Sequence, residues 1–159
     1  MKTRKEVATE KFLAGYNCAQ SVLYAYADEL NLDKETALKV AAGLGGGMAR
    51  RGEICGALAG GILAIGLKYG RGQRDDRSAT ERTYKKAQEL MACFEQQCGS
   101  CRCRDLLQGC DLRTPEGQQH FRKFDLLHKV CLPCVQGIVG ALAGILSEPA
   151  TPSVDARKP

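Results

Sequence analysis

Hydrophobic residues recur at helical spacing along most of the chain. In segments 18–30, 78–98 and 115–127 the apolar positions return every three or four residues, with polar positions between them, as in a helix with one buried face. The segments 54–69 and 135–146 are apolar almost throughout and are expected to form core helices. No segment carries a convincing strand pattern. We therefore predict an all-α fold, a single-domain bundle of six or seven helices.

Capping residues predict where these helices begin. Asn17 followed by Gln20 is a variant of the capping box and places Cys18 at the first helical position. Further helix starts are expected at Asp33, at Ser78 with Glu81, and at Thr114 before Pro115. The last segment, 148–159, contains three prolines. We expect a folded domain over 1–147 and a disordered tail over 148–159.

The chain is organised around the stretch 52–60, G-E-I-C-G-A-L-A-G. Gly56 and Gly60 are four residues apart, so they share one face of the predicted helix. That face has almost no side chain, and we expect it to lie against another backbone or a bound group. The pentapeptide G-A-L-A-G recurs at 140–144, which suggests two helices whose small faces pack closely.

A second glycine cluster, which includes Gly46 and Gly47, precedes this stretch. It does not match a dinucleotide fingerprint, because no strand precedes it and its spacing is wrong. Its backbone could approach a ligand, with Arg50 and Arg51 nearby to meet an anion. A tight turn between helices is the simpler interpretation.

Composition excludes several classes of function. The 159 residues are 44% hydrophobic, so a core can form without disulfides, and the net charge is only +5. No basic stripe with interleaved aromatic residues indicates nucleic-acid binding. The N-terminus is charged, and the uncharged runs 54–67 and 130–146 are shorter than the roughly 20 residues of a membrane span. We expect a cytoplasmic protein without membrane insertion, and no motif supports a hydrolase or kinase.

Nine cysteines carry the candidate chemistry. In a reducing compartment such a number indicates redox exchange, catalysis or metal binding rather than structural disulfides. Cys18 and Cys55, as well as Cys131 with Cys134, are expected in first helical turns, where free N–H groups favour a thiolate. We expect these helix starts to converge, with Cys18 close to Cys55, and with Cys18 and Cys131 the most reactive thiols.

Two C-x-x-C pairs allow two kinds of chemistry. The pair of Cys131 and Cys134 is similar to the motif in which one cysteine attacks a disulfide and the other resolves it. Together with Cys98 and Cys101 it could instead hold zinc or an iron–sulfur cluster. His128, three residues before Cys131, could contact that thiol on a helix, although such a histidine is more often solvated. Cys93, Cys110 and His120 have no assigned role.

Several motifs in their order along the chain carry a resemblance: N-C-A-Q around Cys18, G-L-G-G-G-M at 43–48, C-G-A-L-A-G at 55–60, G-L-K-Y-G at 66–70, C-R-D-L-L at 103–107, and Cys131. This set resembles the C_GCAxxG_C_C family of redox-active proteins. The resemblance implies a helical fold, a redox role and four key cysteines, which are Cys18, Cys55, Cys103 and Cys131. Cys98, Cys101 and Cys134 look like additions to that pattern.

Three hypotheses follow for the function. The first is a thiol-based redox protein that serves an unknown redox partner. The second is a protein that binds zinc or an iron–sulfur cluster through cysteine ligands. The third is a helical interaction module whose cysteines are mostly structural. A homo-oligomer is compatible with all three hypotheses.

Overall fold

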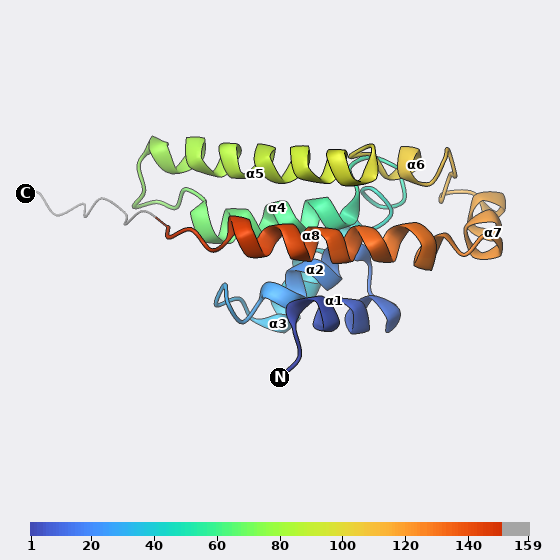
Figure 1. The fold of residues 1–159 in the computed structure, drawn as a ribbon, viewed down its shortest axis with the longest axis horizontal. Helices are drawn as coiled ribbons and strands as arrows, with labels where there is room; N and C mark the ends of the chain where they lie inside the picture. Colours follow the sequence, from blue (N-terminus) through green and yellow to red (C-terminus); the bar gives the residue numbers. More distant parts are fainter. Residues whose placement is uncertain (151–159) are drawn as a thin grey trace, which may run out of the picture.

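The computed structural model describes residues 1–150 of the chain. Within this part the fold is all-α, as predicted, and holds eight α-helices and no strand (Figure 1). The count exceeds the predicted six or seven because short pieces such as α6 form helices of their own. The α-helices are α1 (Arg4–Leu13), α2 (Cys18–Tyr26), α3 (Lys34–Val40), α4 (Gly56–Tyr69), α5 (Arg77–Cys98), α6 (Cys103–Leu106), α7 (Pro115–Lys123) and α8 (Leu132–Ile145).

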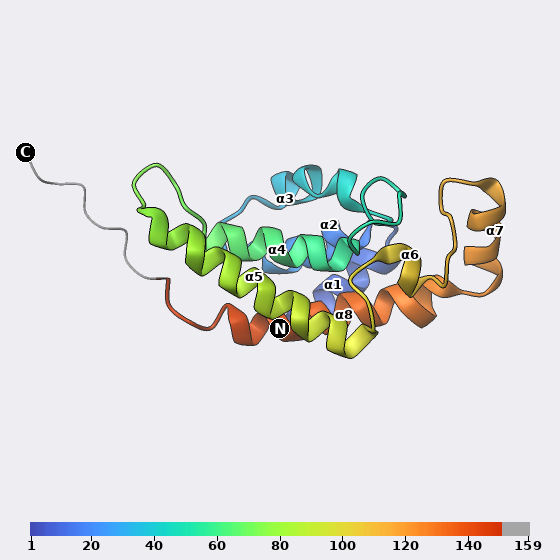
Figure 2. The ribbon, with the colours of Figure 1, turned by 90° about the horizontal axis from the view of Figure 1, so that it is seen from above.

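The core lies where the apolar helices α4 and α8 meet their neighbours. α4 packs on α2, α5 and α8, while α1 packs on α2 and α8. Figures 1 and 2 show α4, α5 and α8 side by side, with α7 at one end of the molecule. Leu58, Ile65, Leu90 and Leu142 are fully buried between these helices. The segments 54–69 and 135–146, which the sequence predicted to be core helices, therefore form the centre of the bundle.

Local capping explains where most helices begin. The Asn17 side chain accepts a hydrogen bond from the Gln20 N–H, and the Gln20 side chain accepts one from the Asn17 N–H, both at 2.9 Å. This capping box confirms the predicted start of α2 at Cys18. The predicted capping box of Ser78 with Glu81 is wrong. Asp76 caps α5 instead and accepts a hydrogen bond from the Ser78 N–H at 2.8 Å.

The C-terminal helix begins earlier than expected. A π-helical turn, η2 (Leu127–Cys131), runs directly into α8. Cys131 has helical dihedral angles, φ −66° and ψ −45°, and lies in the interior of a continuous helix. The prediction that Cys131 and Cys134 occupy a first turn is therefore wrong, and neither thiol benefits from free N–H groups of a helix start.

The continuous helix Leu127–Ile145 is 19 residues long with a hydropathy of 1.4, which is long and apolar enough to cross a bilayer by length and composition alone. The sequence had predicted a shorter apolar run. Core helices of globular bundles meet the same criterion. In this bundle Val135, Ile138 and Val139 are buried against the other helices.

The small face of α4 meets the backbone of α2. A β-carbon built on Gly60 would lie 2.6 Å from the Ala19 carbonyl oxygen, and one on Gly56 would lie 3.0 Å from the Leu44 carbonyl oxygen and 3.4 Å from the Ala19 nitrogen. The prediction that these glycines face another backbone is confirmed. The second G-A-L-A-G segment behaves differently, because Gly140 and Gly144 have open space where a β-carbon would stand. The close packing predicted for that segment is wrong.

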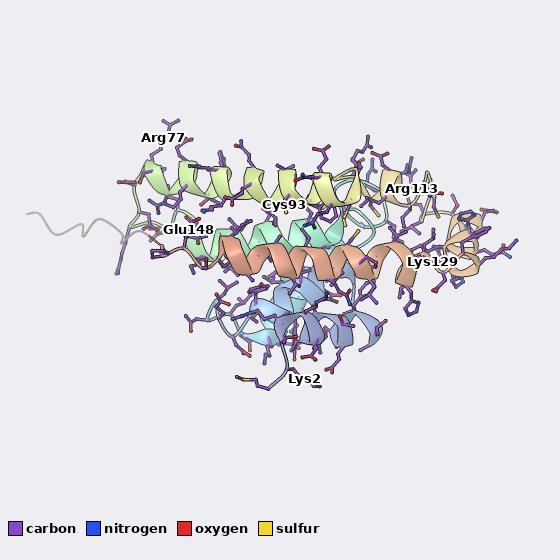
Figure 3. All side chains as sticks on the ribbon, in the orientation of Figure 1. Lys2, Arg77, Cys93, Arg113, Lys129 and Glu148 are labelled. Carbon is purple, nitrogen blue, oxygen red and sulfur yellow. The ribbon has the colours of Figure 1, made fainter. Side chains whose placement is uncertain are left out.

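The predicted tail begins with an ordered residue. Glu148 forms an ion pair with Lys86 at 2.5 Å, and its carbonyl oxygen accepts a hydrogen bond from the Tyr69 hydroxyl at 2.8 Å. Figure 3 shows Glu148 toward the end of the molecule that also holds Arg77, far from Arg113 and Lys129. Residues 151–159 of the predicted tail lie outside the described part of the chain.

Candidate functional site

Five cysteines line one cavity of about 310 Å³ between the helix ends. They are the five thiols that the sequence singled out for redox chemistry: Cys18, Cys55, Cys103, Cys131 and Cys134. The cavity wall also contains Gly46 and Gly56. The other two glycines proposed for a cofactor lie elsewhere. Gly60 packs on Ala19, and a β-carbon on Gly47 would lie 2.6 Å from that of Cys103.

Backbone pairing brings Cys55 and Cys103 to the same wall. The Cys55 N–H donates to the Cys101 carbonyl at 2.8 Å, and the Cys103 N–H donates to the Glu53 carbonyl at 2.7 Å. These bonds flank the isolated bridge between Ile54 and Arg102. They join the starts of α4 and α6, so the two cysteines sit on adjoining chain segments although 47 residues separate them in sequence.

The cysteines of C-L-P-C do not form a pair with each other. The Cys18 thiol interacts with that of Cys131, and the Cys55 thiol interacts with that of Cys134. The Cys134 thiol also donates a hydrogen bond to the Cys98 sulfur at 3.8 Å. Each cysteine at a helix start therefore faces one cysteine of the C-terminal helix. The cavity holds two thiol pairs from different helices instead of one local C-x-x-C dithiol.

Cys55 has the lowered pKa expected of a nucleophile. The hydrogen bond from Cys134 lowers the pKa of Cys55 to about 7, helped by the backbone N–H groups of Ala57 and Leu58 and opposed by burial. Cys55 is the N-cap residue of α4 and is only 5% exposed. A cysteine of ordinary pKa is only a few per cent thiolate at neutral pH, and a lowered pKa raises that fraction.

The other cavity thiols favour the neutral form. Hydrogen bonding with Cys131, together with burial, raises the pKa of Cys18 well above its ordinary value. This direction is opposite to the one expected from the position of Cys18 at a helix start. The hydrogen bond to Cys55 likewise raises the pKa of Cys134. Burial raises the pKa of Cys103 to about 12, and the neighbouring cysteine charges add to the shift.

The proposed metal ligands are divided between several places. The Cys134 sulfur lies 3.8 Å from that of Cys98, and the Cys101 thiol points to the Met91 carbonyl at 3.6 Å. Cys131 faces Cys18 instead. Within residues 1–150, no group of three or more cysteine, histidine, aspartate or glutamate side chains is arranged to hold a metal ion.

The remaining cavity wall is mostly apolar and includes one cation and the amide of Asn17. Phe12, Tyr16, Phe121 and Leu127 line the cavity together with the guanidinium-bearing Arg50. The sequence pattern marked Phe121 and Leu127 only as positions on the face of a helix, and it gave no signal for Phe12 and Tyr16. Arg50 had a sequence signal, because it follows the glycine cluster that could bring backbone to a ligand.

The residues without an assigned role stay apart from the cavity. His128 is exposed and forms a 2.7 Å contact with Asp125 through Nδ1. His120 is exposed and packs on Phe124, with ring centroids 4.5 Å apart. The Cys110 thiol donates to the Gly117 carbonyl at 3.1 Å. Cys93, labelled on α5 in Figure 3, is not part of the cavity wall.

Comparison with known proteins identifies the family to which the chain belongs. The family model described as "Putative redox-active protein (C_GCAxxG_C_C)" matches residues 16–145, which include every cavity cysteine. An "Uncharacterized protein" of Archaeoglobus fulgidus is 36% identical over 107 residues, covering 63% of this chain and 71% of that protein. No solved structure matches significantly. The family match covers most of the chain, and the chain therefore belongs to the C_GCAxxG_C_C family.

Proposed function

We propose that the protein is a dithiol–disulfide oxidoreductase in which Cys55 is the nucleophile and Cys134 the resolving thiol. One observation carries this proposal: Cys55 and Cys134 line the same cavity, and the interaction with Cys134 lowers the pKa of Cys55 to about 7. A thiolate at neutral pH next to a second thiol is the arrangement that disulfide exchange requires. The family membership supports a redox role in general.

The reaction proceeds in two exchanges. The Cys55 thiolate attacks one sulfur of a substrate disulfide, which forms a mixed disulfide on Cys55 and releases the first substrate thiolate. The Cys134 thiol then loses its proton to that leaving thiolate or to water and attacks the Cys55 sulfur. A Cys55–Cys134 disulfide forms, and the second substrate sulfur leaves as a thiolate that takes a proton from water. Two protein thiols are oxidised, and one substrate disulfide is reduced to two thiols.

The second exchange becomes easier once the first has occurred. The hydrogen bond to Cys55 is the main cause of the raised pKa of Cys134. In the mixed disulfide the Cys55 sulfur carries no negative charge, so that cause is removed and Cys134 ionises more readily. The Cys98 sulfur lies 3.8 Å from that of Cys134, so Cys98 can compete with Cys55 for a disulfide with Cys134.

A neutral reagent, dithiodipyridine, tests the proposal when it is added in less than molar equivalence. The reduced protein should release two thiopyridones for each reagent consumed and keep no pyridyl group. The Cys134→Ala variant should release one thiopyridone for each reagent consumed and retain a pyridyl adduct on Cys55. Peptide mass spectrometry detects this adduct. The control Cys93→Ala, outside the cavity, should behave as the wild type. An adduct on Cys55 in the wild type as stable as that in Cys134→Ala would contradict the proposal.

A cluster or zinc site is the second candidate, and the observation that favours it is the lining of one cavity by five cysteines. Thiolates are suitable ligands for both groups. Among the described residues, no three such side chains are arranged to hold one metal ion. Metal analysis and an absorption spectrum of protein purified without oxygen test this alternative.

We further propose that the protein acts in a reducing compartment, the cytoplasm, and is served by a redox partner that restores its dithiol. The support is the cysteine content, since an odd number of cysteines is unsuited to a fully paired framework within one chain. Cellular fractionation of the tagged protein tests the location.

A further inference from the structure

The thiol cavity contains one charged group that disulfide exchange itself does not use. Among the described residues that line the cavity, Arg50 is the one with a permanent charge. It also lines an adjoining hollow that is bounded by Asn17, Gly45 and Ala49. Arg50 is exposed, and none of the ion pairs formed within residues 1–150 includes it. Its charge is therefore available to a ligand that enters the cavity.

An unusual backbone segment holds Arg50 at this place. Five consecutive residues, 46–50, have positive φ, and three of them are not glycine: Met48 at 63°, Ala49 at 49° and Arg50 at 66°. Residues with a β-carbon rarely adopt this left-handed conformation. Backbone hydrogen bonds maintain it here, including Arg50 N–H to the Gly45 carbonyl at 3.1 Å and Gly52 N–H to the Gly46 carbonyl at 3.1 Å.

The apolar side chains of the cavity wall favour a ligand that carries an apolar group. Phe12, Phe121 and Leu127 face the space that the cysteines share with Arg50. A ligand that fills this space would place an apolar group against these side chains and a negative charge at the guanidinium. The guanidinium pairs well with carboxylates, because its planar N–H donors match their two oxygens.

We infer that the substrate is a small organic disulfide with an apolar body and a carboxylate, held by Arg50 while Cys55 attacks it. This inference rests on the proposed dithiol chemistry, and it adds the class of molecule on which that chemistry acts. Electrons and atoms follow the two exchanges given above. The substrate disulfide accepts two electrons from Cys55 and Cys134 and leaves as two thiols, of which at least one carries the carboxylate.

Two aromatic disulfides of different charge test the inference. Dithiobis(nitrobenzoate) carries carboxylates, and dithiodipyridine is neutral at the pH of the assay. We expect Arg50→Gln to slow the first phase of the reaction with the anionic reagent by on the order of threefold to tenfold, as for other lost charge contacts at a binding rim. The rate with the neutral reagent should not change.

Matched variants separate a specific contact from the overall charge. Arg51→Gln removes the same charge from an exposed neighbour that does not line the cavity, and it should react as the wild type with both reagents. Arg50→Lys should keep most of the rate with the anionic reagent. With the anionic reagent, added salt should reduce the difference in rate between the wild type and Arg50→Gln, because exposed charges are screened.

The outcomes distinguish this inference from the function on which it rests. Equal slowing by Arg50→Gln and Arg51→Gln, or no slowing by either, would overturn the assignment of Arg50 while Cys55 still reacts with both reagents. If Arg50→Gln slowed both reagents to the same extent, a change in loop structure would explain it, and the inference would again be wrong. A Cys55 that reacts with neither reagent would instead refute the dithiol function.

Discussion

The α-carbon of Gly60 lies directly against the backbone of Ala19, so that a β-carbon would stand 2.6 Å from the Ala19 carbonyl oxygen. This close approach of α4 to α2 keeps Cys18 and Cys55 at the same cavity. Gly60→Ala should therefore destabilise the fold by about 1–3 kcal/mol through overpacking against a backbone that cannot move aside. Urea denaturation followed by circular dichroism measures the change.

Gly144 provides the matched control on α8. It is exposed, and a β-carbon there would meet open space. Gly144→Ala should leave stability unchanged or raise it by about 0.4–1 kcal/mol, since alanine restricts the unfolded chain. Equal effects of the two substitutions would show that the contact of α2 with α4 is not tight.

The reactivity of Cys55 should follow its lowered pKa. Its alkylation rate by iodoacetamide should rise with pH and level off above a midpoint of about 7, because only the thiolate reacts. Cys134→Ala removes the hydrogen-bond donor and should move this midpoint upward. Cys134→Ser keeps a donor and should shift it less. Peptide mass spectrometry after short pulses gives the rate at Cys55, and a midpoint near that of a free cysteine in the wild type would contradict the assignment.

Cys18 should be a slow thiol at neutral pH, in contrast to the expectation from its helix start. The hydrogen bond to Cys131 raises its pKa, and burial adds to the shift. In the same labelling experiment Cys18 should therefore react more slowly than Cys55. Cys131→Ala removes the main cause and should speed the labelling of Cys18. Faster labelling of Cys18 than of Cys55 in the wild type would favour the helix-start argument instead.

Glu148 should contribute to stability through the largely buried Lys86. The ion pair holds the pKa of Glu148 below its usual value and raises that of Lys86. Glu148→Gln leaves the ammonium without this partner and should lower the melting temperature by roughly 2–4 °C at neutral pH. Glu81→Gln, at an exposed position on α5, should have little effect.

The pH dependence of this difference has a defined sign. A carboxylate whose folded pKa is lowered adds stability above its unfolded pKa, and this stability is lost as the pH falls through the folded value. The two melting temperatures should thus converge below about pH 4. If the wild type and Glu148→Gln differed in melting temperature by the same amount at low pH as at neutral pH, the charge of Glu148 would not be the cause.

Local signals accounted for the fold class and for much of the site. The capping box at Asn17 placed Cys18, and the spacing of Gly56 and Gly60 identified the close face of α4, because both features depend on residues near one another in sequence. The same local reasoning failed at Cys131. Pro133 is typical of a helix start, but the preceding π-helical turn continues the helix, and nothing in L-H-K-V-C distinguishes that turn.

The pairing of the thiols could not be predicted, because it depends on tertiary contacts. C-L-P-C suggested a local dithiol, whereas the register of the long helix directs Cys131 to Cys18 and Cys134 to Cys55. The left-handed conformation at Met48 and its neighbours also could not be predicted from the sequence, since residues with a β-carbon favour right-handed conformations. Hydrogen bonds across the whole loop override that preference.

Mapping of the first disulfide tests the central claim most directly. The reduced protein is oxidised with less than one equivalent of a neutral disulfide, free thiols are blocked in acid, and the cross-linked peptides are identified by mass spectrometry. The account predicts that Cys55–Cys134 forms first. A first disulfide between Cys131 and Cys134, or between Cys98 and Cys134 with Cys55 still free, would contradict it.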